Sequence, residues 1–121
     1  MDMRLLVLGV VAATALAASA TQAAADNFGA IAYSTGSGAI GYSYDYGSRD
    51  EAEEHALQEC GPGCQVVVWF KNACGAVAAG SDRGYGTGWA DSRGEAEETA
   101  MRYCQQNSQG CRPVGWTCTS R

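Results

Sequence analysis

The sequence predicts an α+β domain built from a β-β-α-β unit that occurs twice. The main observation is an internal repeat, because residues 48–60 (SRDEAEEHALQEC) return as residues 92–104 (SRGEAEETAMRYC). The stretch GAIA at residues 29–32 likewise returns as GAVA at residues 75–78. All six cysteines lie within residues 60–118. These observations indicate an antiparallel-rich sheet of about six strands with two helices on one face, stapled by disulfides.

Residues 1–25 are predicted to be a secretory signal peptide. Arg4 precedes an uncharged apolar run, Leu5–Ala18, and small residues spaced for cleavage follow it. Cleavage after Ala25 is the preferred position. An uncleaved membrane anchor is the alternative, but the run is shorter than the roughly 20 apolar residues of a membrane span.

Residues 26–121 are expected to form a single domain of two repeats, about residues 28–73 and 74–119. We expect it to be secreted, or held in the periplasm or cell envelope, and to lack a membrane span once the signal is removed. The chain has a net charge of −5, and Lys71 is its one lysine. Because it has no basic stripe, no nucleic-acid partner is expected.

Two strands are predicted to open each repeat. Residues 28–34 and 39–46 are separated by a Gly- and Ser-rich turn, and the second of them alternates between Tyr or Ile and small or polar residues. This period of two is typical of a half-buried strand in a hairpin. Residues 74–80 and 85–91 are the corresponding strands of the second repeat.

A helix is predicted to follow each pair of strands. Ser48 precedes Glu51, and Ser92 precedes Glu95, at the spacing of a capping box, in which the serine oxygen accepts from a backbone N–H and the glutamate reaches back to the serine N–H. The residues expected to face the sheet are Ala52, Ala56, Leu57 and Cys60, with Ala96, Ala100, Met101 and Cys104 in the second helix.

The last strand of each repeat is predicted at residues 65–70 and 113–119. The run Val66-Val67-Val68-Trp69-Phe70 is expected to be buried on both faces. Pro113 begins the final strand, where the missing N–H costs least. The strand order within the sheet does not follow from the sequence.

Six cysteines in an exported protein predict three disulfides, with 15 possible pairings. Cys60 and Cys64 correspond to Cys104 and Cys111 in the second repeat. A pattern that treats the repeats alike joins these cysteines within each repeat, or joins them between repeats as Cys60–Cys111 and Cys64–Cys104. The first is preferred because a helix end and the following strand start are neighbours. The preferred pairs are Cys60–Cys64, Cys104–Cys111 and Cys74–Cys118. Zinc is the alternative, but the cysteine spacings and a single histidine fit zinc sites poorly.

Several of these segments together resemble a bacterial family. They are GAIAYS at residues 29–34, SRDEAE at 48–53, and the run from Cys64 to Ala78 that contains Val-Val-Val-Trp-Phe. The closing Trp-Thr-Cys at residues 116–118 continues the match. The pattern is similar to that of the family called domain of unknown function 4189. The resemblance implies a small exported domain, and it brings no activity, cofactor or catalytic residue with it.

No catalytic, cofactor-binding or metal-ligating residue is predicted from the sequence. His55 is predicted to be a solvated surface residue, because no neighbouring nucleophile suggests a triad. Glu53 and Glu97 recur and could form a carboxylate pair, but a first-turn glutamate near the helix dipole, paired with Arg49 or Arg93, is preferred. The glycine-rich residues 84–88 lack the parts of a phosphate loop and are interpreted as a hairpin turn.

The aromatic residues of the two hairpins are the main indication of binding. The proposed binding surface consists of Tyr42, Tyr44, Tyr85 and Trp89. If both helices cover one face of the sheet, the opposite face is left for water or a partner. Tyr and Trp are common anchors of interfaces.

The leading hypothesis is a secreted, non-enzymatic interaction domain that binds an extracytoplasmic protein, with an enzyme inhibitor as one form. It would act through the open sheet face or through the disulfide-bounded loop Gln105–Gly110. One alternative is a cell-envelope glycan binder that uses Tyr44 and Trp89. Another is a small hydrolase that uses Glu53 and Glu97.

Overall fold

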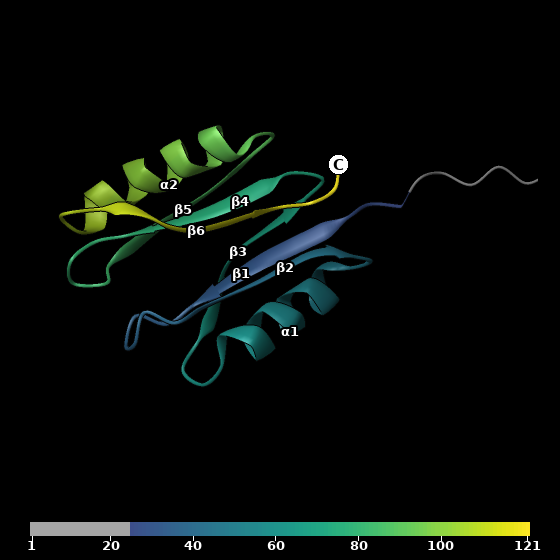
Figure 1. The fold of residues 1–121 in the computed structure, drawn as a ribbon, viewed down its shortest axis with the longest axis horizontal. Helices are drawn as coiled ribbons and strands as arrows, with labels where there is room; N and C mark the ends of the chain where they lie inside the picture. The colour runs from purple at the N-terminus through teal and green to yellow at the C-terminus, as the bar shows by residue number, and fades with distance from the viewer. Residues whose placement is uncertain (1–24) are drawn as a thin grey trace, which may run out of the picture.

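Residues 25–121 are described by a computed structural model, in which two units share one order of elements (Figure 1). The first unit contains β1 (Phe28–Tyr33), β2 (Ile40–Tyr46), α1 (Arg49–Cys60) and β3 (Gln65–Lys71). The second contains β4 (Cys74–Ala79), β5 (Tyr85–Ala90), α2 (Arg93–Asn107) and β6 (Arg112–Cys118). The predicted α+β class and the duplicated β-β-α-β unit are confirmed. Apart from Ala25, the predicted signal peptide lies outside the described residues.

The six strands form two antiparallel three-stranded sheets, ordered β2-β1-β3 and β5-β4-β6. Each unit therefore closes on itself, because its last strand returns to pair with its first strand. The helices lie on the two outer sides of the molecule and do not contact each other (Figure 1). The expected single sheet with both helices on one face is thus replaced by two stacked sheets, each covered by its own helix.

Small residues let each helix lie close to its sheet. Ala52 and Ala56 of α1 are fully buried against Ala30 and Ala32 of β1, as the spacing predicts. Gly41 of β2 has no room for a side chain, since a Cβ there would lie 2.4 Å from the Ala56 carbonyl oxygen. Leu57, expected on this face, is instead exposed. The narrow alanine face leaves no space beneath the helix for its larger side chain.

The two sheets pack together through a second apolar core that contains Ile31, Val68, Phe70 and Val77. The Phe70 ring lies between Gly29 of β1 and Gly75 of β4, where an added Cβ would come within 2.4 and 2.3 Å of ring carbons. The sheet faces opposite the helices are therefore buried against each other. Within residues 25–121, the open sheet face expected from the sequence is therefore absent.

Both helices begin with a serine cap. The Ser48 hydroxyl oxygen accepts from the N–H of Glu51 at 3.2 Å, and that of Ser92 accepts from Glu95 at 3.3 Å. Each glutamate carboxylate accepts from the serine hydroxyl, and not from the serine N–H as a full capping box requires. The predicted helix starts are correct, and each cap is satisfied through the serine side chain.

Three disulfides hold the described chain, and no cysteine in it is free. Cys60–Cys64 and Cys104–Cys111 each join the end of a helix to the segment before the next strand. Cys74–Cys118 links directly opposed residues of β4 and β6, separated by 44 positions in the sequence. These are the pairs preferred from the repeat.

Candidate functional site

The four aromatic residues proposed from the sequence do not form one surface. Tyr42 and Tyr85 pack against the core between the sheets. Tyr44 and Trp89 are 56% and 65% exposed. They lie on β2 and β5, which are edge strands of different sheets and do not contact each other. A shared platform of Tyr44 and Trp89 is therefore not present.

Trp89 instead borders a groove with residues of β3. The groove has a volume of about 260 Å³ and is lined by Trp69, Phe70, Lys71 and Trp89. It lies where the edge strand of one sheet approaches the edge strand of the other. Trp69 is 38% exposed, so the run from Val66 to Phe70 is not buried on both faces as expected. We call this depression the Trp69–Trp89 groove.

Neighbouring side chains fix the orientation of Trp69. The guanidinium of Arg49 lies 4.4 Å from the centre of the indole ring, and Phe28 stacks on the ring at a centroid distance of 6.4 Å. Arg49 is itself held by the Glu53 carboxylate at 2.9 Å. A cation held over an indole face contributes roughly 0.5–1 kcal/mol at an exposed site. One wall of the groove is thus held in place before any ligand arrives.

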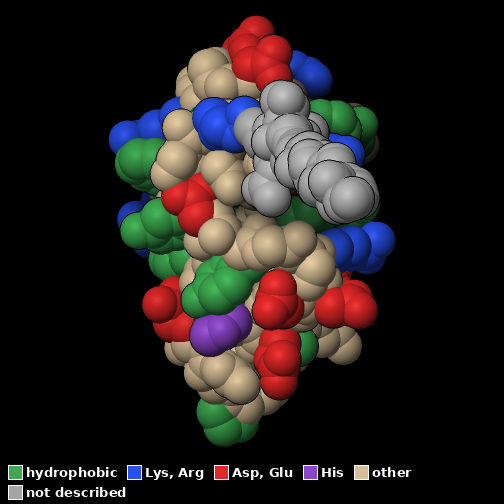
Figure 2. Space-filling model, turned by 90° about the vertical axis from the view of Figure 1, so that its right-hand side faces the viewer, with side chains coloured by type: hydrophobic (Ala, Val, Ile, Leu, Met, Phe, Trp, Pro, Cys, Tyr) green, Lys and Arg blue, Asp and Glu red, His purple; other side chains and the backbone are tan. Residues whose placement is uncertain are grey.

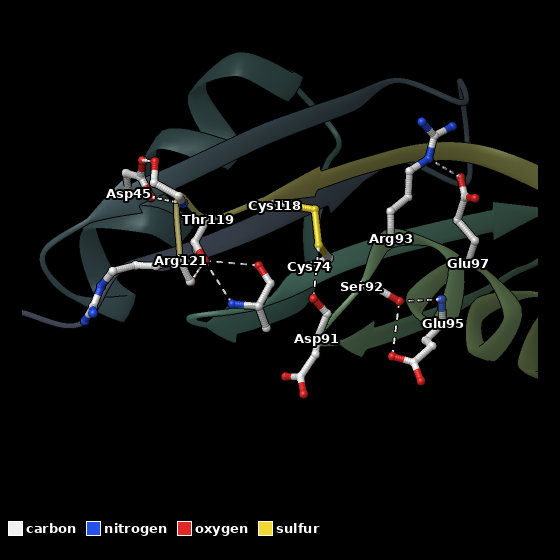
Figure 3. The surroundings of a disulfide bond; sticks show 12 residues. Asp45, Cys74, Asp91, Ser92, Arg93, Glu95, Glu97, Cys118, Thr119 and Arg121 are labelled. Atoms are coloured by element: carbon white, nitrogen blue, oxygen red, sulfur yellow. Dashed lines mark hydrogen bonds and ion pairs between the residues drawn. A yellow bond between two sulfur atoms is a disulfide. The ribbon is translucent and has the colours of Figure 1, made fainter.

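The second unit repeats this cluster on the other side of the molecule. Arg93 lies 4.1 Å from the centre of the Trp116 ring, and Glu97 pairs with Arg93 at 3.3 Å, as Figure 3 shows for the ion pair. Arginine recurs at positions 49 and 93 and tryptophan at positions 69 and 116, and this recurrence is the sequence signal from which the feature could be predicted.

The catalytic candidates have structural surroundings. Glu53 and Glu97 each pair with an arginine one turn earlier, on helices that cover opposite sides of the molecule (Figure 1). The carboxylate pair that a hydrolase would need is therefore not assembled. His55 is exposed and stacks on Tyr46 at a centroid distance of 4.2 Å. Figure 2 shows this histidine at the surface, with acidic side chains on the same face.

Residues 84–88, interpreted as a hairpin turn, lie mostly inside β5. Gly86 and Gly88 face α2, where an added Cβ would lie 2.1 Å from the Cys104 nitrogen and 2.3 Å from the Ala96 carbonyl oxygen. These glycines allow the helix backbone to approach the strand closely. Their role is packing, and the turn interpretation was wrong for this segment.

The segment Gln105–Gly110, predicted to be a loop, begins inside α2, which runs to Asn107, so that only residues 108–110 form a loop. This loop is tied to the β4–β5 turn. The Ser108 hydroxyl donates to the Asp82 carboxylate, and the N–H of Gly84 donates to the same group at 2.9 Å. These bonds hold the pKa of Asp82 below its ordinary value. The loop and the turn border a polar hollow of about 410 Å³. It contains no exposed aromatic anchor.

The C-terminal residues pack against β2. Asp45 is a bulged residue with a φ of 64°, and its carboxylate accepts from the N–H of Ser120 at 2.8 Å and from the Ser120 hydroxyl. These bonds lower the pKa of Asp45. Thr119 donates its N–H to the Ala73 carbonyl oxygen at 2.9 Å, beside the Cys74–Cys118 disulfide (Figure 3). The tail therefore crosses from the second unit to the first.

Within residues 25–121, no group of three His, Cys, Asp or Glu side chains is arranged to hold a metal ion. In the same residues, no helix has the length and apolar character that a membrane crossing requires.

The comparisons with known proteins agree with this architecture. The family model described as Domain of unknown function (DUF4189) matches residues 28–118. The chain belongs to this family. Protein Rv1269c of Mycobacterium tuberculosis is 47% identical over 79 residues, which cover 64% of this chain and 61% of that protein. Uncharacterized protein Rv1813c of the same species is 38% identical over 93 residues, which cover 76% of this chain and 60% of that protein.

A solved structure extends the likeness to the whole fold. The NMR structure of Rv1813c from Mycobacterium tuberculosis matches with a TM-score of 0.59 and 29% identity, and the match covers 98% of each chain. In the sequence comparisons, the chain spans about 60% of the length of the curated relatives it matches. The family likeness therefore establishes the fold of the domain.

Proposed function

We propose that this member of the DUF4189 family is a non-enzymatic interaction domain that acts outside the cytoplasm and binds a protein partner through the Trp69–Trp89 groove. The observation that carries the proposal is the pair of exposed indole rings on either side of one groove. Inhibition of an extracellular enzyme is one form that this binding could take. Three disulfides in a small chain support a location in an oxidising compartment.

The size of the groove favours a protein partner over a small molecule. Its volume of about 260 Å³ is below the roughly 300–1,000 Å³ that is typical of small-molecule sites. It is suited to a single large side chain inserted from a partner surface. Trp and Arg dominate the binding energy of many protein interfaces, and Trp69, Trp89 and Arg49 supply these residue types here.

The structure offers less support for the two alternative functions, a glycan binder and a hydrolase. A glycan platform made of Tyr44 and Trp89 would need two rings that share a face, and these rings are on separate edges. A hydrolase would need Glu53 and Glu97 near each other, and each is instead paired with an arginine on a separate helix.

The experiment is a pull-down with oxidised residues 26–121, against separate fractions of secreted protein, envelope protein and cell-wall glycan. The test variant is Trp89→Ala, and the control is Tyr44→Ala, its equivalent in the first unit. Both side chains are more than half exposed, so neither change should unfold the domain. We expect a protein to be retained by the wild type and by Tyr44→Ala, with at least about tenfold weaker retention by Trp89→Ala.

Two results would count against the proposal. Retention of glycan without any protein would indicate that the domain binds carbohydrate. A protein partner that binds the two variants equally would place the interface elsewhere, with the polar hollow beside the end of α2 and the β4–β5 turn as the next surface to test.

A further inference from the structure

We infer that the Trp69–Trp89 groove recognises one large apolar side chain flanked by carboxylates, and that each chain carries one such site. This inference rests on the proposed function and specifies the chemistry of the partner segment. The occupant is thus an acidic segment of another protein with a single apolar anchor.

The walls of the groove indicate which kind of partner side chain fits into it. Trp69 and Trp89 offer indole surfaces, and Phe70, which is 2% exposed, also lines the groove. A leucine- or tryptophan-sized side chain that moves from water into such a site gains free energy in proportion to the apolar area that it buries. A polar side chain in the same place would lose its water without finding matching donors and acceptors on the rings.

The charge at the edge of the groove indicates which charge the partner segment carries. Lys71 lines the groove and is the one charged residue among the lining residues, in a chain whose net charge is −5. The Arg49 guanidinium, which lies over the Trp69 ring, is already paired with Glu53 and adds little free positive charge. Lys71 already lies 3.7 Å from the Asp26 carboxylate, and both side chains of that pair are about half exposed. Such pairs are weak, so a carboxylate from a partner can share or replace Asp26.

Although the fold is duplicated, the combination of two indole rings and a lysine occurs in one of the two equivalent places. The position equivalent to Lys71 in the second unit is Cys118, which is bonded to Cys74 and has no charge to offer. The residue after Tyr44 is the bulged Asp45, whose carboxylate accepts from the N–H of Ser120 in the C-terminal tail. The other two edge strands that contact each other are β2 and β6. At the position equivalent to the groove, they present the Asp45 carboxylate and the bound C-terminal tail in place of a lysine.

The test uses three pools of short synthetic peptides, titrated calorimetrically into oxidised residues 26–121. One pool has a central Leu or Trp flanked by glutamates, the second has the same centre flanked by lysines, and the third has a central serine flanked by glutamates. We expect the first pool to bind with one peptide per chain. The serine pool should bind at least about tenfold more weakly, because the anchor is lost.

Charge reversal at the rim provides the second readout. Lys71→Glu should lower the affinity for the glutamate-flanked pool about fivefold and raise the affinity for the lysine-flanked pool. Exposed charge pairs contribute up to about 1 kcal/mol each. Arg112→Glu, at the start of β6, makes the same change in net charge away from the groove and is the matched control. Its affinities should equal those of the wild type.

The outcomes separate this inference from the proposed function. Equal binding of the glutamate and lysine pools, two peptides per chain, or no binding of any pool would overturn the inference. If a protein is still captured through Trp89 while no pool binds, the inference alone fails. If the glutamate pool binds as expected while no cellular protein is captured, the proposed function alone fails.

Discussion

Phe70 is the residue on which the contact between the two sheets depends most directly. Its ring is 2% exposed and lies against both Gly29 and Gly75, which occupy equivalent positions in β1 and β4. Neither glycine has a positive φ, so their role here is to leave space and not to allow an unusual backbone conformation. A single methyl group at either position would push the ring out of place.

We therefore predict that Gly75→Ala destabilises the oxidised domain by roughly 1–3 kcal/mol, the usual cost of overpacking a core. Chemical denaturation of the purified domain measures this. Gly94→Ala is the matched control, because it adds the same methyl group in α2 where no atom lies within 4 Å. That variant should be unchanged or up to about 1 kcal/mol more stable. Equal stability of Gly75→Ala and the wild type would show that the Phe70 ring can move aside without loss of stability.

Asp45 provides a pH-dependent contact at the residue scale. Its pKa is held below the ordinary value of 3.8 by hydrogen bonds from the side chain and then the backbone of Ser120. A carboxylate whose folded pKa is depressed stabilises the folded state above its unfolded pKa. That contribution is lost as the pH falls through the lower, folded value.

The Ser120 amide resonance should therefore shift as the pH is lowered below 3.8, when the carboxylate becomes protonated and releases the tail. Asp45→Asn keeps a side chain that tolerates the positive φ and removes the titration. In that variant the Ser120 resonance should show no such step. A step of the same size in both proteins would assign the titration to another group.

The two serine caps act at the scale of the helices. Each satisfies a backbone N–H that the first turn leaves without an intrahelical partner. Ser48 and Ser92 belong to helices that do not contact each other and that cover different sheets. Distant sites without shared partners usually have additive effects on stability.

We predict that Ser48→Ala and Ser92→Ala each lower the free energy of unfolding by about 1 kcal/mol, as cap removal generally does. The double variant should lose the sum of the two. Denaturation curves of the three variants test this. A double variant that loses clearly more than the sum would mean that the two helices are coupled through the stacked sheets.

The repeat predicted the elements well and their assembly less well. The caps and the alanine faces depend on residues a few positions apart, which is why Ser48, Ser92, Ala52 and Ala96 were placed correctly. The division into two sheets depends on pairing between distant strands, and neither hydrophobic period nor turn chemistry encodes it. The groove escaped prediction for the same reason, because Trp69 and Trp89 come from different units and meet only when the sheets stack.

At the scale of the whole molecule, the Cys74–Cys118 disulfide closes the longest loop. Its partners are 44 positions apart, whereas Cys60–Cys64 spans 4 positions. In the chain-entropy account, a longer loop removes more freedom from the unfolded chain. The long bridge also lies beside the tail contact between Thr119 and Ala73.

Replacing both Cys74 and Cys118 with alanine should therefore lower stability by about 4 kcal/mol, and the same change at Cys60 and Cys64 by about 2 kcal/mol. Thermal unfolding of the two double variants provides the comparison. A larger loss from the short bridge would show that native packing at the end of α1, and not the unfolded chain, governs its contribution.

The position of Phe70 also means that the two halves of the molecule are not interchangeable. The Phe70 ring fills the one space between Gly29 and Gly75. The position equivalent to Phe70 in the second unit is Thr117, which pairs with Gly75 as Phe70 pairs with Gly29. Two copies of the first half, arranged like the two units, would bring two Phe70 rings to that single space. The first half would therefore not assemble with a second copy of itself in this arrangement.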